Sequence, residues 1–209
     1  SNFEEIHQAA FDVGRPHSVC VNRNGERFVD EACSYDEFGA AMVADQQKSG
    51  ANTPCWLVFD ATFRKNYTAG GFMPTALMPD WLIPADNWDH YIFRADSLNA
   101  LAAKIHIPTD ALRRTVSNIN AYARTGVDPE FGRGGNDYDR MFGDPGVTPN
   151  PCLGAIETAP FYAVAINLGD LGTKGGLKAD AHARVVDGSG QPIPNLYAAG
   201  NNSGSPFGN

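Results

Sequence analysis

Two long irregular stretches do most to limit what this sequence can fold into. Residues 63–88 mix aromatic side chains, methionine, Gly-Gly and proline without a clean hydrophobic period, and residues 126–154 are polar and rich in glycine and proline. Loops of this length are uncommon inside a compact domain, and those that occur usually carry function. Regular structure is therefore confined to short segments between these stretches.

Hydrophobic patterning predicts where those segments lie, and it predicts both helices and strands. Amphipathic patterns and glycine stop signals predict helices over 34–49, 97–104 and 109–124, and residues 3–12 read as the end of another helix. Apolar runs predict strands over 55–60, 161–166, 183–187 and 196–199, and Asn24-Gly25 predicts a hairpin within 18–31. The expected fold class is α+β, with a mixed or antiparallel sheet.

Composition excludes several kinds of partner. The net charge of −8 argues against nucleic acid and against a basic membrane-binding surface. No apolar run approaches the roughly 20 residues that cross a bilayer, so we expect no transmembrane segment. The cysteines form no C-x-x-C pair and no histidine has metal-ligand spacing from them, which predicts no metal site, reduced thiols and a cytoplasmic location.

Three separate blocks of sequence resemble one group of flavoenzymes. They are RPHSVCVNRNGERFVDEACSY from Arg15, GVDPEFGRGGNDYDRMFGDPGVTPNPCLGAI from Gly126, and GDLGTKGGLKADAHARVVDGSGQPIPNLYAAGN from Gly169. These sequences are similar to those of the FAD-dependent 3-ketosteroid dehydrogenase branch of the fumarate reductase/succinate dehydrogenase flavoprotein superfamily. The resemblance implies a substrate-binding cap domain over 18–160. It also assigns 1–17 to the end of an FAD-domain helix and crossover, and 161–209 to the β-rich C-terminal part of a Rossmann-like FAD-binding domain.

The resemblance also implies that FAD is the cofactor of a longer enzyme. The dinucleotide fingerprint G-x-G-x-x-G occurs nowhere in the 209 residues. We therefore expect the chain to be a fragment with a truncated FAD domain that does not hold FAD by itself and is inactive alone. The alternative for the chain as it stands is a non-catalytic substrate-binding module, with possible dimerisation through exposed strand edges.

The family resemblance implies that Tyr67 is the proton-transfer residue. The steroid branch places its cap tyrosine in the pattern F-D-x-x-F/Y-R-x-x-Y, and this sequence reads FDATFRKNY from Phe59 to Tyr67. A tyrosine hydroxyl suits the removal of a proton next to a ketone in an apolar pocket. The alternative interpretation, which does not use the motif, is that Tyr67 is a loop tyrosine packed beside Phe63 and Phe72.

The substrate implied by the steroid branch is a small-molecule apolar ketone, with an external electron acceptor completing the reaction. The candidate substrate-binding residues are Phe63, Phe72, Met73 and Trp81. A fumarate-like acid is the competing substrate, and it needs convergent arginine and histidine side chains. Residues 63–88 contain one arginine, Arg64, and no histidine. The composition of this stretch thus favours the apolar ketone.

The glycine-rich blocks supply the candidate cofactor-binding residues. Glycine lets backbone approach a flat ligand where a Cβ would collide, although such a segment also reads as a plain hairpin. His17 and Ser18 lie where the chain passes near the flavin in the family. The cofactor-binding set is Ser18, Gly169, Asp170, Gly172, Gly176, Gly200, Asn201 and Ser203.

Overall fold

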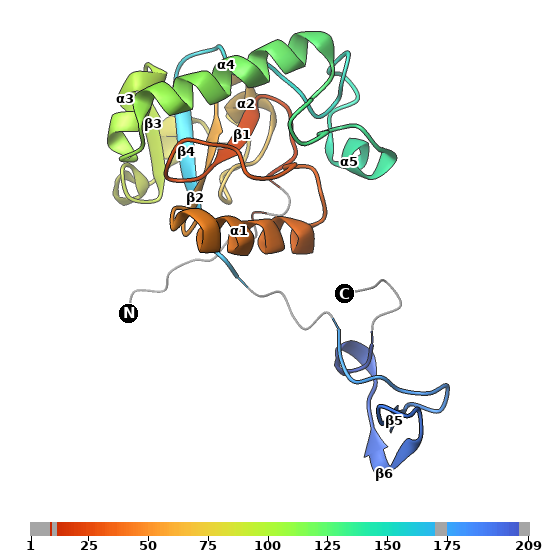
Figure 1. Ribbon diagram of the computed structural model, residues 1–209. Coiled ribbons are helices and arrows are strands. Elements are labelled where there is room, and N and C mark those ends of the chain that lie inside the picture. Colours follow the sequence, from red (N-terminus) through yellow and green to blue (C-terminus); the bar gives the residue numbers. More distant parts are fainter. Residues whose placement is uncertain (1–8, 10–11, 170–174, 205–209) are drawn as a thin grey trace. The chain divides into compact units, whose positions relative to one another are not determined.

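The computed structural model describes residues 9, 12–169 and 175–204, and the chain divides into two compact units after Leu168 (Figure 1). The first unit is built on a four-stranded sheet of order β1-β2-β4-β3 in which every neighbouring pair is antiparallel. The strands are β1 (Ser18–Val21), β2 (Cys55–Phe59), β3 (Ile92–Ala95) and β4 (Phe161–Ile166). Together with the helices, this sheet confirms the α+β class.

Both faces of the sheet are buried, so side chains that alternate along a strand enter two different apolar clusters. On β2, Leu57 and Phe59 join one cluster, while Trp56 and Val58 join the other. This explains why the strand reads as a continuous apolar run instead of an alternating one.

Helices cover the two faces of the sheet and make the first unit three-layered (Figure 1). Helices α3 (Leu98–Lys104) and α4 (Thr109–Thr125) pack on one face, and α1 (Tyr35–Ser49) packs on the other. The expected stripe of α4 is buried and consists of Leu112, Val116, Ile119 and Ala123. Gly50 and Gly126 end α1 and α4 in the left-handed conformation, as their stop signals predict.

The two long irregular stretches are largely irregular in the structure, with short helices set into them. The first contains most of α2 (Ala61–Asn66) and the 3-10 turns η2 (Asp80–Leu82) and η3 (Ala85–Asn87). The second contains α5 (Asp137–Phe142). Helices of one or two turns bury too few side chains to leave a clear hydrophobic period, and sequence patterning missed α2 and α5 for that reason.

Two further expectations differ from the structure. The turn at Asn24-Gly25 forms, but no second strand follows it, because Arg27 and Glu31 are drawn into a buried ion-pair network; β1 pairs with β2 instead. The expected boundary at residue 161 also differs from the division into units, since β4 lies between β2 and β3 and the first unit continues to Leu168.

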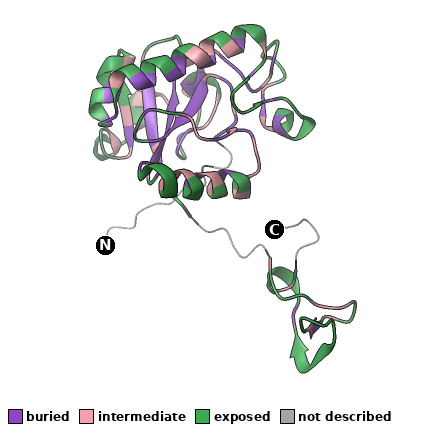
Figure 2. Ribbon diagram, in the orientation of Figure 1, coloured by how far each residue is buried: buried purple, intermediate pink, exposed green. Residues whose placement is uncertain are grey.

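The second unit, Gly169–Asn209, contains a two-stranded antiparallel sheet. Its elements are β5 (Arg184–Val186), β6 (Pro192–Tyr197) and the 3-10 turn η4 (Gly200–Asn202). Every residue of β6 is exposed (Figure 2), and within 175–204 only Val185 and Ala198 are buried apolar side chains. The described part of this unit therefore has almost no apolar core.

Candidate active site

Tyr67 stands at the end of the short helix α2, whose start is fixed by a buried aspartate. One carboxylate oxygen of Asp60 accepts from the backbone N–H groups of Thr62 and Phe63, and the other accepts from Glu157 and Thr158 just before β4. The Tyr67 ring packs edge-on against Phe63, with ring centroids 5.2 Å apart. The motif FDATFRKNY therefore encodes an N-cap, a core phenylalanine and a positioned tyrosine.

The Tyr67 hydroxyl donates a hydrogen bond of 2.6 Å to Asp144 Oδ2. Burial raises the pKa of the half-buried Tyr67, and the hydrogen bond to the Asp144 carboxylate raises it further. The same hydrogen bond holds the pKa of Asp144 below its ordinary value, helped by the Gly146 N–H. The pair at neutral pH is thus a neutral phenol that donates to a charged carboxylate.

Arg15 adds a positive charge beside this pair. Its guanidinium carbon lies 5.9 Å from the Tyr67 ring centroid, and its Nη1 donates to the Gly143 carbonyl at 2.9 Å. The backbone of Asp144 is held in turn by its N–H, which donates to the Pro151 carbonyl at 2.8 Å. The hydrogen bond between Tyr67 and Asp144 therefore joins the first irregular stretch to the second.

A buried ion-pair network supports the segment that carries Arg15. The Arg133 guanidinium donates to the carbonyls of Arg15 and Ser18 at 2.6 and 2.9 Å and lies 3.2 Å from Glu31 Oε2. Arg27 binds both Glu31 and Asp128 at 2.8 Å. Burial raises the pKa of Glu31, but the charges of Arg27 and Arg133 outweigh it and hold that pKa below its ordinary value.

The four candidate substrate-binding residues divide into two kinds. Phe63 and Phe72 are buried in the cluster that includes Leu57. Met73 is 45% exposed and Trp81 is 80% exposed, so these two side chains are available to a ligand. We call the exposed apolar side chains between residues 73 and 82 the apolar segment; its members are Met73, Leu77, Trp81 and Leu82.

Arg64 holds the backbone of this apolar segment in place through hydrogen bonds. Its side chain is fully buried and uses all three nitrogens: Nε donates to Asp80 at 3.1 Å, Nη2 donates to the Met78 carbonyl at 2.7 Å, and Nη1 donates to the Met73 carbonyl. Asp80 also accepts from the Tyr162 hydroxyl of β4 at 2.6 Å. Arg64 is therefore committed to the fold and not free to pair with a ligand carboxylate.

His17 and Ser18 are both engaged within the first unit. His17 has a left-handed backbone with φ 66°, and its Nδ1 lies 2.7 Å from the Ala155 carbonyl. The buried Ser18 hydroxyl donates to the Arg15 carbonyl at 2.7 Å. These contacts fix the chain where it enters β1.

The second unit brings the two glycine-rich segments together. Leu177 N–H donates to the Asn202 carbonyl at 2.9 Å, and Gly204 N–H donates to the Leu177 carbonyl at 3.0 Å. A Cβ on Gly176 would lie 2.5 Å from the Asn202 backbone, so this glycine is required by the loop itself. The predicted residues Asp170 and Gly172 lie outside the described residues.

Other glycines of the second unit leave open space. Gly169 and Gly200 are exposed, and no heavy atom lies within 4 Å of the position of an added Cβ on either. The Ser203 hydroxyl donates to the Gly200 carbonyl at 2.9 Å, while Asn201 is exposed. Backbone of this kind fits the close approach of a flat cofactor.

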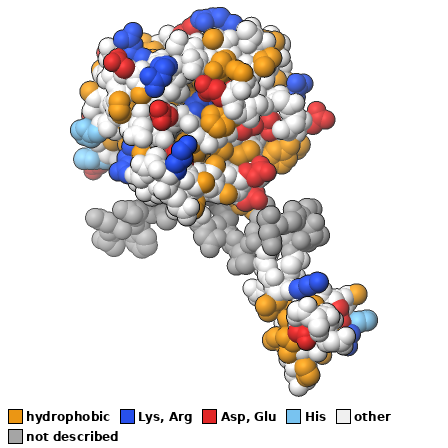
Figure 3. All heavy atoms as spheres, in the orientation of Figure 1, with side chains coloured by type: hydrophobic (Ala, Val, Ile, Leu, Met, Phe, Trp, Pro, Cys, Tyr) orange, Lys and Arg blue, Asp and Glu red, His pale blue; other side chains and the backbone are white. Residues whose placement is uncertain are grey.

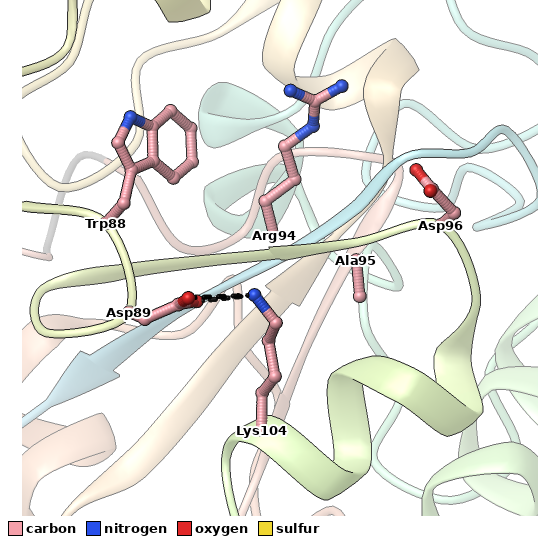
Figure 4. A pocket seen from close by; sticks show the side chains of 6 residues that line it. All are labelled: Trp88, Asp89, Arg94, Ala95, Asp96 and Lys104. Carbon is pink, nitrogen blue, oxygen red and sulfur yellow. Dashed lines mark hydrogen bonds and ion pairs between the residues drawn. The ribbon is translucent and has the colours of Figure 1, made fainter. Parts of the chain in front are cut away.

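A surface hollow beside β3 is of a different character (Figure 4). Its lining is mostly polar, and Lys104 forms an ion pair of 2.7 Å with Asp89 across it. The lining residues are Trp88, Asp89, Arg94, Ala95, Asp96 and Lys104. It offers little apolar surface for a ketone of the expected class.

The described ranges carry neither a cluster of metal ligands nor a membrane-spanning helix. No group of three or more His, Cys, Asp or Glu side chains there could hold a metal ion. Within the same ranges, no helix combines the length and apolar character needed to cross a bilayer.

Comparison with known proteins shows the class to which this chain belongs. Residues 6–209 match the family model described as the FAD binding domain, and the chain belongs to that family. A crystal structure of 3-ketosteroid delta1-dehydrogenase from Sterolibacterium denitrificans, in complex with 1,4-androstadiene-3,17-dione, is similar with a TM-score of 0.85 and 45% identity. That match covers 92% of this chain and 34% of the crystallised one.

Two curated relatives extend this result. The 3-oxosteroid 1-dehydrogenase of Mycobacterium tuberculosis (strain ATCC 25618 / H37Rv) is 40% identical over 198 residues, or 92% of this chain and 34% of the relative. The 4-oxocyclohexanecarboxylate 2-dehydrogenase of Sinomonas cyclohexanicum is 38% identical, over 94% of this chain and 33% of the relative. The chain spans about a third of the length of these relatives, and the resemblance expected from the three sequence blocks is confirmed.

Sequence reasoning alone missed Asp144 and Arg15. Both lie inside the blocks that carry the family resemblance, but neither stands out by residue type or spacing. The one local signal was the turn sequence GDPG, in which an aspartate commonly caps its own turn, as Asp144 does through the Gly146 N–H.

Proposed function

We propose that this chain supplies the proton-transfer and substrate-covering part of an FAD-dependent dehydrogenase that desaturates an apolar ketone of the 3-ketosteroid kind. The observation that carries the proposal is the Tyr67 hydroxyl, which is half-buried, fixed by α2 and hydrogen-bonded to Asp144. A positioned tyrosine of this kind can take up the proton next to a carbonyl group. The three relatives named above are dehydrogenases of ketones, which agrees with this chemistry.

The apolar segment supports a ketone with a large apolar surface. It exposes Met73 and Trp81 on the same chain segment that follows Tyr67. Removing such side chains from water by contact with a ligand contributes roughly 25 cal/mol per Å². A fumarate-like acid is disfavoured because Arg64, the one arginine in 63–88, is buried and already paired with Asp80.

FAD supplies the hydride acceptor when it is bound, and the chain's own residues do the rest. Tyr67 removes the proton, and the Asp144 hydrogen bond orients its hydroxyl. The apolar segment binds the substrate and excludes water from the reacting carbon. Gly200, Asn201 and Ser203 would face the cofactor, because their loop is exposed and Gly200 leaves open space for it.

The remaining assignments follow from the same proposal. Residues 1–17 and 161–209 belong to the FAD-binding part and 18–160 to the cap, and an external electron acceptor would complete the reaction. Ser18, Gly169 and Gly176 act as supports of the cofactor region. A cytoplasmic location agrees with four free cysteines, which are typical of a reducing compartment. Dimerisation through the exposed strand β6 is a further proposal.

The proposal is tested with a hybrid enzyme in which these 209 residues replace the matched segment of the M. tuberculosis relative. We expect the hybrid to retain flavin and to reduce an artificial electron acceptor when given a 3-ketosteroid. Fumarate and 4-oxocyclohexanecarboxylate are the comparison substrates, and the unaltered relative is the control for the assay. A flavin-loaded hybrid that uses either comparison substrate but no 3-ketosteroid would overturn the proposed substrate class.

A further inference from the structure

We propose that Asp144 is the proton acceptor behind Tyr67, so that the two side chains form a relay. Tyr67 takes a proton from the substrate carbon while its own hydroxyl hydrogen passes to Asp144 Oδ2, 2.6 Å away. Asp144 acts through Tyr67 and is thus a positioning residue with a proton-accepting role. This inference rests on the proposed function of Tyr67 and deepens it.

The need for a second group follows from the state of the tyrosine. Tyr67 is a neutral phenol at neutral pH, because burial and the Asp144 carboxylate both raise its pKa. A neutral phenol can accept a proton only if it gives up its own hydrogen at the same time. The hydroxyl already points that hydrogen at Asp144 Oδ2, so the acceptor is in place before substrate arrives.

The step balances within these groups. The C–H bond next to the ketone breaks, a new O–H bond forms on Tyr67, and its former hydrogen forms an O–H bond on Asp144. The electron pair of the C–H bond remains with the substrate carbon, next to the carbonyl that stabilises it. Asp144 becomes neutral, and because it is only half-buried it can return the proton to solvent.

The surroundings of Asp144 fit an acceptor that is charged at rest. The other carboxylate oxygen, Oδ1, accepts from the Gly146 N–H at 2.8 Å, which leaves Oδ2 for Tyr67. The charged and titratable groups facing the pair from the neighbouring segment are Arg15 and His17. Arg15 favours the carboxylate, so the resting pair carries its negative charge on Asp144 and not on Tyr67.

The direct test measures the titration of Tyr67 in the 209-residue chain, using the ¹³Cζ resonance assigned through Tyr67→Phe. In Asp144→Asn, which keeps an oxygen for the Gly146 N–H, we expect Tyr67 to deprotonate about one pH unit lower than in wild type. Asp137→Asn removes an equal charge from the exposed start of α5 and is expected to leave Tyr67 unchanged. If Tyr67 deprotonates at the same pH in wild type and in D144N, the Asp144 carboxylate does not raise the pKa of Tyr67 and the relay is contradicted.

The functional test uses the hybrid enzyme. D144N is expected to lower kcat by about 10²-fold with little change in KM, D144E to recover part of the loss, and D137N to lose nothing. If Y67F is inactive while D144N keeps wild-type kcat, the relay is wrong and the proposed role of Tyr67 stands. If Y67F keeps wild-type kcat, the proposed role of Tyr67 fails and the relay fails with it.

Discussion

The two units of this chain differ in how many apolar side chains each buries within itself. The first encloses a sheet between helices and has two apolar clusters, whereas the described part of the second buries only Val185 and Ala198. Figure 3 shows apolar side chains at the surface of the second unit. Leu177, Leu196 and Tyr197 are exposed apolar side chains of this unit. A scaffold that supports itself can hold a proton-transfer pair, while a loop surface without a core needs other parts to cover it.

This difference separates two sets of candidate residues. Tyr67 and Asp144 belong to the first unit and are fixed by its sheet and ion-pair network. Gly200 and Asn201 belong to the second unit and offer exposed backbone. We therefore expect substitutions to lower the free energy of unfolding far more in the first unit than in the second.

The largest effect is expected for Glu31→Gln in the buried network. It leaves the buried charges of Arg27 and Arg133 short of one partner, and breaking such a pair costs about 3–5 kcal/mol of unfolding free energy. Urea denaturation measures the loss. In the second unit, Asp180→Asn breaks an exposed pair with Arg184 and is expected to leave the midpoint unchanged.

The same network predicts the acid side of the stability profile. The folded-state pKa values of Glu31 and Asp128 lie below their ordinary values, so their stabilisation is present above the unfolded pKa and is lost as pH falls. Wild type should therefore lose stability below about pH 4, and E31Q should show a shallower decline. Parallel curves for the two proteins would contradict the assignment.

The next effect compares one leucine from each unit. Leu112 of α4 is fully buried, and Leu112→Ala is expected to cost about 3 kcal/mol through lost burial and a cavity. Leu196 of β6 is 40% exposed, and Leu196→Ala should cost less than about 0.5 kcal/mol. Similar losses from the two variants would mean that the second unit has a core comparable to the first.

A smaller and opposite effect is expected at Asp30 in the first unit. Burial raises its folded-state pKa to about 7, so the cost of ionising Asp30 develops between the pKa of the unfolded chain, roughly 4, and pH 7, is complete above pH 7 and is absent below about pH 4. Asp30→Asn keeps an acceptor for the Ala32 N–H and is expected to add about 1 kcal/mol at pH 8, after allowance for solvent screening, and nothing at pH 4. Thermal melts at the two pH values measure the difference.

The last prediction concerns the cofactor and the second unit. The exposed loop at Gly200 offers backbone to FAD, but the G-x-G-x-x-G fingerprint does not occur in the 209 residues, so the chain is expected to purify colourless. A visible absorption spectrum with and without added FAD provides the measurement, and the hybrid enzyme is the positive control. A chain that retains the yellow flavin band through gel filtration would show that it holds FAD unaided.

Much of the scaffold could be predicted from the sequence because its signals are local. The stripe on α4 and the apolar run of β2 need no knowledge of distant residues. Strand β3 was missed because Ile92–Ala95 is short and carries the exposed Arg94, so its apolar pattern is weak. The division at Leu168 was missed because β4 looks like part of the β-rich tail but pairs within the first sheet.

The site could be predicted only in part, because its second half depends on tertiary contacts. The family pattern made Tyr67 a candidate, whereas its hydrogen-bond partner Asp144 is 77 residues away in a segment without regular periodicity. Arg64 is the one arginine in 63–88, and the fold buries it, where it donates to the carbonyls of Met73 and Met78. Neither outcome follows from residue type and spacing.

The central claim is that Tyr67, fixed by the first unit, removes the proton during ketone dehydrogenation. The most direct measurement is kcat of the hybrid enzyme with a 3-ketosteroid before and after Tyr67→Phe, at equal flavin content. The phenylalanine keeps the ring contact with Phe63 and removes only the hydroxyl. We predict a loss of kcat between about 10² and 10⁴-fold, whereas a variant that retains kcat within twofold would contradict the account.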